Sequence, residues 1–212
     1  MRDLRVCFVG DSFVAGVGDP EHRGWVGRLC ERSENAGLPL TAYGLGVRRQ
    51  TSADVLARWH AECSPRLAAG EDRRVVVSFG VNDITVEAGS PRVEAEASVA
   101  ALGTLLDGVA RAGWSGMVVG PPPIDDAAQN RRIAALDRSF AELCASRGTP
   151  YATVFDALVD CPVWSREVAE GDGAHPGAAG YQRFADLVWP VWSGGRARTT
   201  TDEFRRGSRS HS

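Results

Sequence analysis

Three short polar segments of this 212-residue chain carry side chains that could catalyse a reaction together. Ser12 lies in the first segment, Asn82 in the second, and Asp172 and His175 in the third. A serine hydroxyl is a weak nucleophile unless a base removes its proton, and histidine is the usual base near neutral pH. Because Asp172 precedes His175 closely, a tight loop would let the carboxylate hold one ring nitrogen and leave the other free. This pattern favours a Ser–His–Asp triad that activates Ser12 for attack on a carbonyl carbon.

The remaining histidines are poorer candidates for the base. His22 lies in a charged loop, His60 follows Trp59 in a predicted helix, and His211 lies in a polar C-terminal segment. No second histidine or cysteine is spaced to complete the three or four ligands that zinc prefers. We therefore expect a site without a metal ion.

Composition excludes several other kinds of chemistry. All 24 basic residues are arginines, so no lysine is available for a Schiff base with pyridoxal phosphate or for a Walker A phosphate loop. The formal net charge of −3 argues against a protein dedicated to nucleic-acid binding. We expect a small-molecule substrate, no cofactor and no nucleic-acid partner.

Cysteine usage and hydropathy indicate the compartment. The five cysteines are widely spaced and odd in number, without a CxxC pair, which is typical of reduced thiols in the cytoplasm. The apolar run at residues 6–9 is too short for a signal peptide. No segment approaches the roughly 18 apolar residues that cross a bilayer. These features predict a cytoplasmic protein without stable membrane insertion.

Short apolar runs alternate with longer segments of helical periodicity. We predict five strands, at residues 5–9, 40–45, 73–79, 116–119 and 151–155. Helices are predicted at residues 52–63, 91–112, 130–147 and 176–192. Alternation of this kind predicts a parallel sheet covered by helices on both faces. Since ligands bind at the carboxyl ends of such strands, the polar segments after the first and third strands should meet there.

The predicted elements form one domain over residues 1–192. Residues 193–212 are polar and rich in Gly, Ser and Arg, which predicts a disordered tail. The sequence does not set the oligomeric state, which is unknown at this point.

Taken together, the three polar segments resemble a known family. Gly-Asp-Ser at 10–12, Gly-x-Asn-Asp at 80–83 and Asp-x-x-His at 172–175 occur in the order found in GDSL-type esterases and lipases of the SGNH hydrolase superfamily. The resemblance implies a three-layer α/β/α, flavodoxin-like fold with a five-stranded parallel sheet. It also implies metal-independent hydrolysis of carboxylic esters or thioesters.

The same resemblance implies a role for each site residue. Ser12 would be the nucleophile that forms an acyl-enzyme intermediate, His175 its base, and Asp172 the partner that orients the histidine. The oxyanion hole would contain the backbone N–H of Ser12 and the side-chain amide of Asn82. A further backbone N–H would complete the hole.

The chain departs from the family pattern at that last donor. The family usually has a glycine two residues before a threonine, and aligning this threonine with Thr51 places Arg49 at the glycine position. The N–H of Arg49 can serve as well, although a positive φ is uncommon for arginine, and Gly46 is the fallback donor. The guanidinium of Arg48 or Arg49 could also point into the site and favour an anionic substrate.

Two other functions would use some or all of these residues. The glycine-rich loop at 10–18 could hold a phosphate in a flavodoxin-like binding module without catalysis. That loop has no basic residue, however, and the binding module leaves Asp172 and His175 without a role. An acyltransferase would use the same triad with an acceptor other than water. The serine hydrolase accounts for the most residues, and its partner would be a small-molecule ester or thioester.

Overall fold

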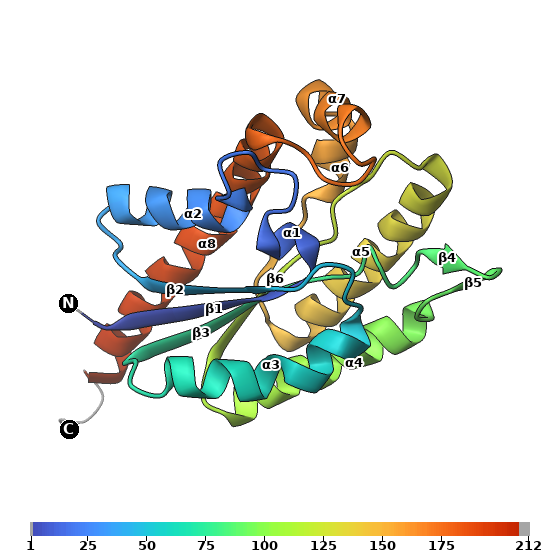
Figure 1. Ribbon diagram of the computed structural model, residues 1–212. Helices are drawn as coiled ribbons and strands as arrows, with labels where there is room; N and C mark the ends of the chain where they lie inside the picture. The colour runs from blue at the N-terminus through green and yellow to red at the C-terminus, as the bar shows by residue number, and fades with distance from the viewer. Residues whose placement is uncertain (1, 208–212) are drawn as a thin grey trace.

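The computed structural model describes the backbone of residues 2–207 and the side chains of residues 2–194. The strands of the main sheet are β1 (Leu4–Gly10), β2 (Thr41–Gly46), β3 (Asp72–Ser78), β6 (Ser115–Val119) and β7 (Tyr151–Ala152). They are parallel and lie in the order β2-β1-β3-β6-β7, with helices on both faces (Figure 1). This is the strand order of flavodoxin-like doubly wound sheets. The predicted five-stranded α/β fold is confirmed.

The centre of the sheet is apolar because helices cover both of its faces. Val75, Val76 and Val77 of β3 are each at most 1% exposed, although their side chains alternate between the two faces. In the register of the sheet, Gly10 at the end of β1 lies opposite both Gly46 of β2 and Ser78 of β3. The three strands therefore end level with one another, and the segments that follow them start from one edge.

The helices divide between the two faces of the sheet. On one face, α2 (Gly24–Asn35) packs against α8 (Ala178–Gly207); the other carries α3 (Ser52–Leu67), α4 (Ala95–Arg111) and α5 (Ala127–Arg147) (Figure 1). Short elements follow the carboxyl ends of strands: α1 (Ser12–Ala15), α6 (Phe155–Val159), α7 (Pro162–Glu170) and a hairpin of β4 (Val86–Glu87) and β5 (Ser90–Pro91). None of the helices among the described residues has an apolar stretch long enough to span a bilayer.

All four predicted helices have different ends in the structure: α3 runs on to Leu67 instead of residue 63, and α5 begins at Ala127 instead of residue 130. The helix predicted at 91–112 begins only after Glu94, because Ser90 and Pro91 pair with β4 in the hairpin. The last helix continues past residue 192 to Gly207, with no proline after Pro190 to stop it. The backbone of 193–207 is thus helical where a disordered tail is predicted. Residues 208–212 of that tail lie outside the described residues, and the domain boundary at 192 stays a prediction.

Four helices are absent from the sequence prediction: the single turn of α1, and α2, α6 and α7. Helix α2 has no side-chain N-cap bond and contains Gly24 and Gly27, so its start signal and its propensity are both weak. Helix α6 begins at Phe155, within the strand predicted at 151–155, which leaves only Tyr151 and Ala152 in β7. The short lengths of α6 and α7 give periodicity too few residues to act on.

Candidate active site

The structure brings Ser12, His175 and Asp172 together at the carboxyl edge of the sheet. Ser12 Oγ lies 2.7 Å from His175 Nε2, across 163 residues of sequence. The other ring nitrogen, Nδ1, lies 2.8 Å from Asp172 Oδ2. The three side chains therefore form a continuous hydrogen-bonded series from hydroxyl to carboxylate, in the arrangement that a Ser–His–Asp triad needs.

Ser12 is held by a sharp turn from β1 into α1. Gly10 is required at this turn, because a Cβ there would lie 1.9 Å from the Ser78 carbonyl oxygen. Asp11 caps α1, and its Oδ1 accepts a hydrogen bond of 3.0 Å from the N–H of Phe13. Ser12 is the first residue of the helix, so its own N–H has no partner within the helix. The serine thus presents both a hydroxyl and a backbone donor at the same place.

The carboxyl of Asp11 is almost completely buried below the serine. Burial raises its pKa, the Phe13 N–H lowers it, and the nearby Asp83 carboxylate raises it, which together bring the pKa to about 7. Near neutral pH this side chain is therefore partly protonated. A neutral Asp11 opposes the formation of negative charge beside Ser12 less than a carboxylate would.

The loop from Asp172 to His175 is organised by the aspartate itself. Asp172 Oδ1 accepts hydrogen bonds from the N–H groups of Ala174, at 3.1 Å, and His175, at 2.9 Å. Burial raises the pKa of Asp172, but the hydrogen bonds and the charge of His175 outweigh it and bring the pKa to about 2. The aspartate is therefore ionised throughout the neutral range and can support a positive imidazole ring.

His175 is 7% exposed and packs against aromatic side chains. Its ring lies 4.8 Å from that of Phe13, which stacks in turn on Trp164. Trp164 is fixed by a 3.0 Å hydrogen bond from its Nε1 to the carbonyl of Pro123. Burial lowers the pKa of His175, and Asp172 compensates only in part. The ring is consequently neutral, and able to accept a proton, over more of the pH range than an exposed histidine.

Arg49 adopts the conformation that its alignment with a glycine demands. Its φ is +67°, in the left-handed region, which costs a residue other than glycine about 1–2 kcal/mol. It is the third residue of the turn Val47–Gln50, closed by a 3.3 Å bond from the Gln50 N–H to the Val47 carbonyl. Since Arg48 lacks a positive φ, this is the pattern of a type II turn. Among the described residues, the Arg49 N–H donates to no protein group, so it is available to a ligand.

Asn82 lies beside this turn. Its Nδ2 donates a 2.9 Å hydrogen bond to the Gln50 carbonyl and is 3.4 Å from Asp11 Oδ2. The first contact is strong and the second is weak, so one N–H of the amide can turn to a ligand at small cost.

Gly46, the fallback oxyanion donor, has a packing role. A Cβ at this position would lie 2.2 Å from the backbone nitrogen of Ala15 and 2.6 Å from the carbonyl oxygen of Asp11. The glycine therefore allows α1 to sit directly against the end of β2. Its role as a donor stays a prediction.

The guanidinium groups of Arg48 and Arg49 are both held by carboxylates. Arg48 Nη2 lies 3.1 Å from Asp172 Oδ2, and Arg49 Nη2 lies 3.1 Å from Glu87 Oε1. Both arginine side chains are more than half exposed. Neither guanidinium is an unpaired cation available to an anionic substrate.

One buried ion pair of the active-site loops is absent from the sequence prediction. Asp19 lies in the loop after α1, and its carboxylate pairs with Arg28 of α2, with both side chains at most 3% exposed. Asp19 also accepts hydrogen bonds from the backbone N–H groups of Glu21, Arg23 and Gly24. Burial raises the pKa of Asp19, but the hydrogen bonds from Arg28 and the backbone outweigh it and bring the pKa to about 2. Arg28 lies four residues after Gly24, in the first turns of α2. The sequence could therefore indicate this pair only if α2 had first been recognised as a helix.

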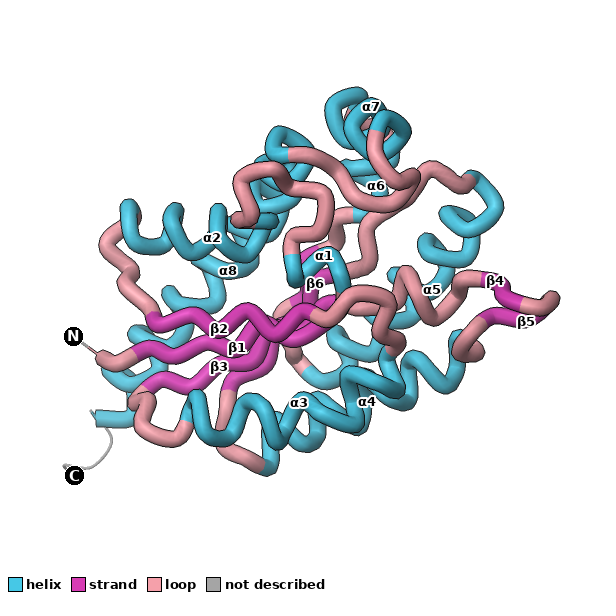
Figure 2. The backbone as a smooth tube through the Cα atoms, viewed as in Figure 1, coloured by secondary structure: helices cyan, strands magenta, loops and turns pink. Residues whose placement is uncertain are grey.

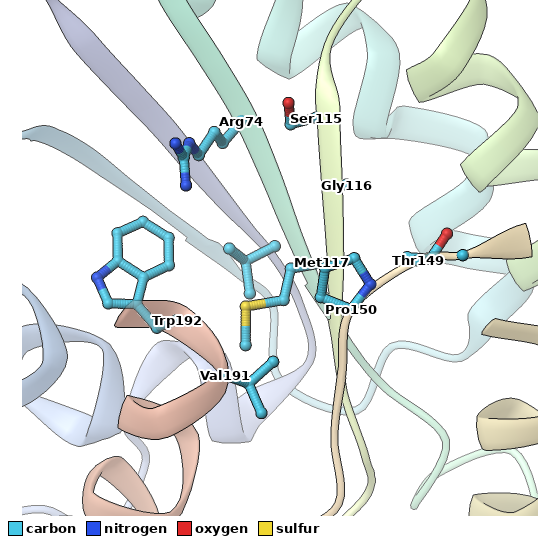
Figure 3. A pocket seen from close by; sticks show the side chains of 10 residues that line it. Arg74, Ser115, Gly116, Met117, Thr149, Pro150, Val191 and Trp192 are labelled. Carbon is cyan, nitrogen blue, oxygen red and sulfur yellow. The ribbon is translucent and has the colours of Figure 1, made fainter. Parts of the chain in front are cut away.

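No group of three or more potential metal ligands is found in the part of the chain that the structure describes. A cavity of about 300 Å³ lies elsewhere, between β3, β6 and α8 (Figure 3). Its lining includes Arg74, Ser115 and Trp192, and the first two stand at the beginnings of their strands, opposite the carboxyl edge. Arg74 is already paired with Asp72 through two hydrogen bonds, so this cavity adds nothing to the site around Ser12.

Comparison with known proteins defines the class: this is an enzyme that hydrolyses esters. The sequence profile of the GDSL-like Lipase/Acylhydrolase family matches residues 8–183, which include all three polar segments. The chain therefore belongs to the GDSL-like lipase/acylhydrolase family, as its resemblance implied. Esterase TesA of Pseudomonas aeruginosa is 26% identical over 186 residues, covering 86% of this chain and 85% of that protein.

Solved structures share the fold. The lipase/acylhydrolase from Enterococcus faecalis superimposes with a TM-score of 0.73 at 21% identity, over 90% of this chain and 96% of that one. Axe2, an acetylxylan esterase from Geobacillus stearothermophilus, gives a TM-score of 0.71 at 15% identity, over 89% and 93% of the two chains. At these identities the likeness shows that the fold is common to the three proteins.

Proposed function

We propose that the chain cleaves carboxylic esters or thioesters through a covalent acyl-enzyme on Ser12. The observation that carries this proposal is the 2.7 Å contact between Ser12 Oγ and His175 Nε2, with Asp172 on the other ring nitrogen. The ring of His175 is neutral near pH 7 because its pKa is lowered by burial. A neutral base in hydrogen-bond contact with the hydroxyl is what activation of a serine requires.

In the acylation step, His175 Nε2 takes the proton of Ser12 as Oγ attacks the substrate's carbonyl carbon. The carbonyl π electrons move onto oxygen, which forms a tetrahedral oxyanion. The oxyanion collapses, the bond to the alkoxide or thiolate breaks, and the leaving group takes the proton from His175. Asp172, ionised because its pKa is about 2, stabilises the imidazolium between these events.

Deacylation repeats these events with water. His175 removes a proton from water, the hydroxide oxygen attacks the acyl carbon, and Ser12 Oγ leaves with the proton that the ring returns. The products are the free acid and the regenerated hydroxyl. Another acceptor in place of water would give acyl transfer by the same steps, so the two reactions differ only in what reaches the acyl-enzyme.

The oxyanion would be stabilised by three donors that are in place before reaction. These are the N–H of Ser12 at the start of α1, the N–H of Arg49 in its type II turn, and Nδ2 of Asn82. The two backbone donors have no protein acceptor among the described hydrogen bonds. Preorganised donors of this kind contribute on the order of 10²–10³ in turnover each.

A fluorophosphonate probe tests the nucleophile. It should label the wild-type protein on Ser12, and mass spectrometry of the labelled peptide should place the adduct there. Labelling should vanish in Ser12→Ala and fall strongly in His175→Ala, with circular dichroism showing that both variants are folded. A folded wild-type protein that takes no label would overturn the proposal and favour the non-catalytic phosphate-binding module.

A panel of nitrophenyl esters and matched thioesters would identify the substrate class. We expect small to medium acyl groups, in line with the acetyl ester named for one structural neighbour. The measurement is kcat/KM against acyl length, and the Ser12→Ala variant supplies the background. A nucleophile added alongside water then separates hydrolysis from transfer, because a transferase would give the acylated acceptor as the main product.

A further inference from the structure

The β4–β5 hairpin projects from the body of the protein just after the Asn82 segment (Figure 2). Its turn is formed by Ala88 and Gly89, whose φ values of +52° and +87° are both positive, which is the pattern of a type I′ turn. Val86 pairs with Pro91 and Glu87 with Ser90. The hairpin therefore has a defined register and presents its side chains at set positions.

Two side chains of this hairpin segment hold Arg49. Arg92 Nη1 donates a 2.9 Å hydrogen bond to the Arg49 carbonyl oxygen, and Glu87 Oε1 lies 3.1 Å from the Arg49 guanidinium. Arg92 Nε is also 3.7 Å from Glu87 Oε1. Both the backbone and the side chain of Arg49 are thus attached to one structural element.

The residues beside Arg49 are attached to the same segment. Asn82 Nδ2 donates to the Gln50 carbonyl at 2.9 Å, and the Ser52 N–H donates to Asp83 Oδ1 at 2.7 Å. Three backbone groups between Arg49 and Ser52 are therefore held by side chains from residues 82–92. They are the carbonyls of Arg49 and Gln50 and the N–H of Ser52. The two segments that carry proposed oxyanion donors are thus joined by several hydrogen bonds.

The base of the hairpin is itself anchored to the protein. The Arg92 N–H donates to the Thr85 carbonyl at 3.0 Å, which closes the hairpin below its two strands. From α5, Arg132 Nε donates to the Ile84 carbonyl at 3.0 Å, and Gln129 Nε2 donates to Thr85 Oγ1 at 2.9 Å. Helix α5 therefore supports the element that holds Arg49.

Arg49 needs such support because its backbone is strained. A glycine adopts a positive φ freely, whereas arginine at +67° would relax by rotating the adjoining peptides. Arg92 pins the carbonyl of the peptide that follows Arg49, which opposes that rotation. The Arg49–Glu87 ion pair is exposed on both sides, so it should contribute less than the Arg92 bond.

We propose that the hairpin is a positioning device that keeps the Arg49 N–H aimed at the reacting carbonyl, with Arg92 as its main positioning residue. The proposal rests on the proposed function, because it assumes that Arg49 is an oxyanion donor. In this chain the hairpin holds position 49 at the positive φ that a glycine would adopt freely. Loss of the hairpin contact should therefore affect the rate of acylation and leave substrate affinity almost unchanged.

The test compares variants of Arg92, Glu87 and Arg49 on a nitrophenyl ester. Arg92→Met should lower kcat roughly tenfold with little change in KM, which is less than the loss of a whole donor. Arg92→Lys should restore part of the rate, and Glu87→Gln should have a smaller effect than Arg92→Met. In an Arg49→Gly background, adding Arg92→Met should lower kcat by less than about twofold, because glycine adopts the positive φ of this turn without support.

Arg147→Met is the matched control. Arg147 also donates to a backbone carbonyl, that of Gly103 at 2.9 Å, and pairs with an acidic side chain, Asp107 at 2.6 Å, but it lies between α4 and α5. It should leave kcat unchanged, and thermal unfolding of each variant checks the fold. An equal loss from Arg92→Met in both backgrounds, or no loss in either, would overturn the proposal. Activity that survives Ser12→Ala would instead refute the proposed function itself.

Discussion

Arg48 and Asp172 form an ion pair beside the proposed catalytic histidine, although 124 residues separate them in sequence. Arg48 Nη2 lies 3.1 Å from Asp172 Oδ2, the same oxygen that lies 2.8 Å from His175 Nδ1. One carboxylate oxygen therefore links the arginine to the proposed base. The pair is exposed, so its effect on folding is small, within about 1 kcal/mol, and its effect on the histidine is of more interest.

The position of this pair predicts how activity depends on pH. The base must be neutral. Burial lowers the pKa of His175 more than Asp172 raises it, and the Arg48 charge lowers it by a smaller amount, so activity should persist below pH 6.5. Arg48→Gln removes a positive charge and leaves Asp172 free to stabilise the imidazolium, so the acid limb of kcat/KM should move to higher pH. The shift should shrink at high ionic strength. An acid limb that stays in place, or moves to lower pH, would argue against this coupling.

Asp172→Asn should separate catalysis from folding. An asparagine oxygen can still accept the hydrogen bonds from Ala174 and His175, so the loop should keep its shape. It offers no charge to support the imidazolium, and kcat should fall by on the order of 10³–10⁴. Steady-state kinetics and a thermal unfolding curve measure both quantities on one sample. A loss of less than about tenfold would remove Asp172 from the proposed triad.

Asn82→Ala should reduce kcat by on the order of 10²–10³ if its amide is an oxyanion donor. The substitution also removes the hydrogen bond to the Gln50 carbonyl, so the change in KM must be measured alongside. Asn82→Asp keeps the size of the side chain, loses the donor, and adds a charge that repels the oxyanion. It should be at least as damaging as the alanine variant. Full activity in the aspartate variant would contradict the assignment.

Arg28→Met should destabilise the protein strongly. It leaves the buried Asp19 carboxyl without its charged partner, and breaking a buried pair in this way costs about 3–5 kcal/mol. Arg32→Met is the matched control, because Arg32 pairs with Asp186 on an exposed surface and should cost no more than about 1 kcal/mol. Urea unfolding measures both. Equal costs would show that burial of the pair has no special effect.

Removal of metal ions should leave the reaction unchanged. The proposed mechanism activates Ser12 through His175 alone, and each proton in it is transferred by that ring. Prolonged dialysis against a chelator, followed by assay with and without added Zn²⁺ or Mg²⁺, is the measurement. A loss of rate that a divalent ion restores would require a different mechanism.

The sequence by itself determined the class of fold and the identity of the triad candidates. Val75, Val76 and Val77 predict a buried strand on their own, because three adjacent apolar residues need cover on both faces. Ser12 follows one such strand, and parallel strands end at a common edge, so its neighbours could be sought among polar segments elsewhere. Asp172 and His175 were identifiable because they are close in sequence and their contact forms within one loop.

Tertiary structure alone decided the parts of the site that depend on distant pairs. Arg49 reaches a φ of +67°, Arg48 meets Asp172, and Arg92 meets the Arg49 carbonyl. No periodicity or local motif encodes these features, since each depends on loops whose paths are set by the packing below them. The hairpin that begins after Ile84 shows the limit most clearly: Ser90 and Pro91 have the residue types of a helix start, yet pairing with β4 makes them a strand. Local propensity is weak there, and a few cross-strand contacts were enough to overrule it.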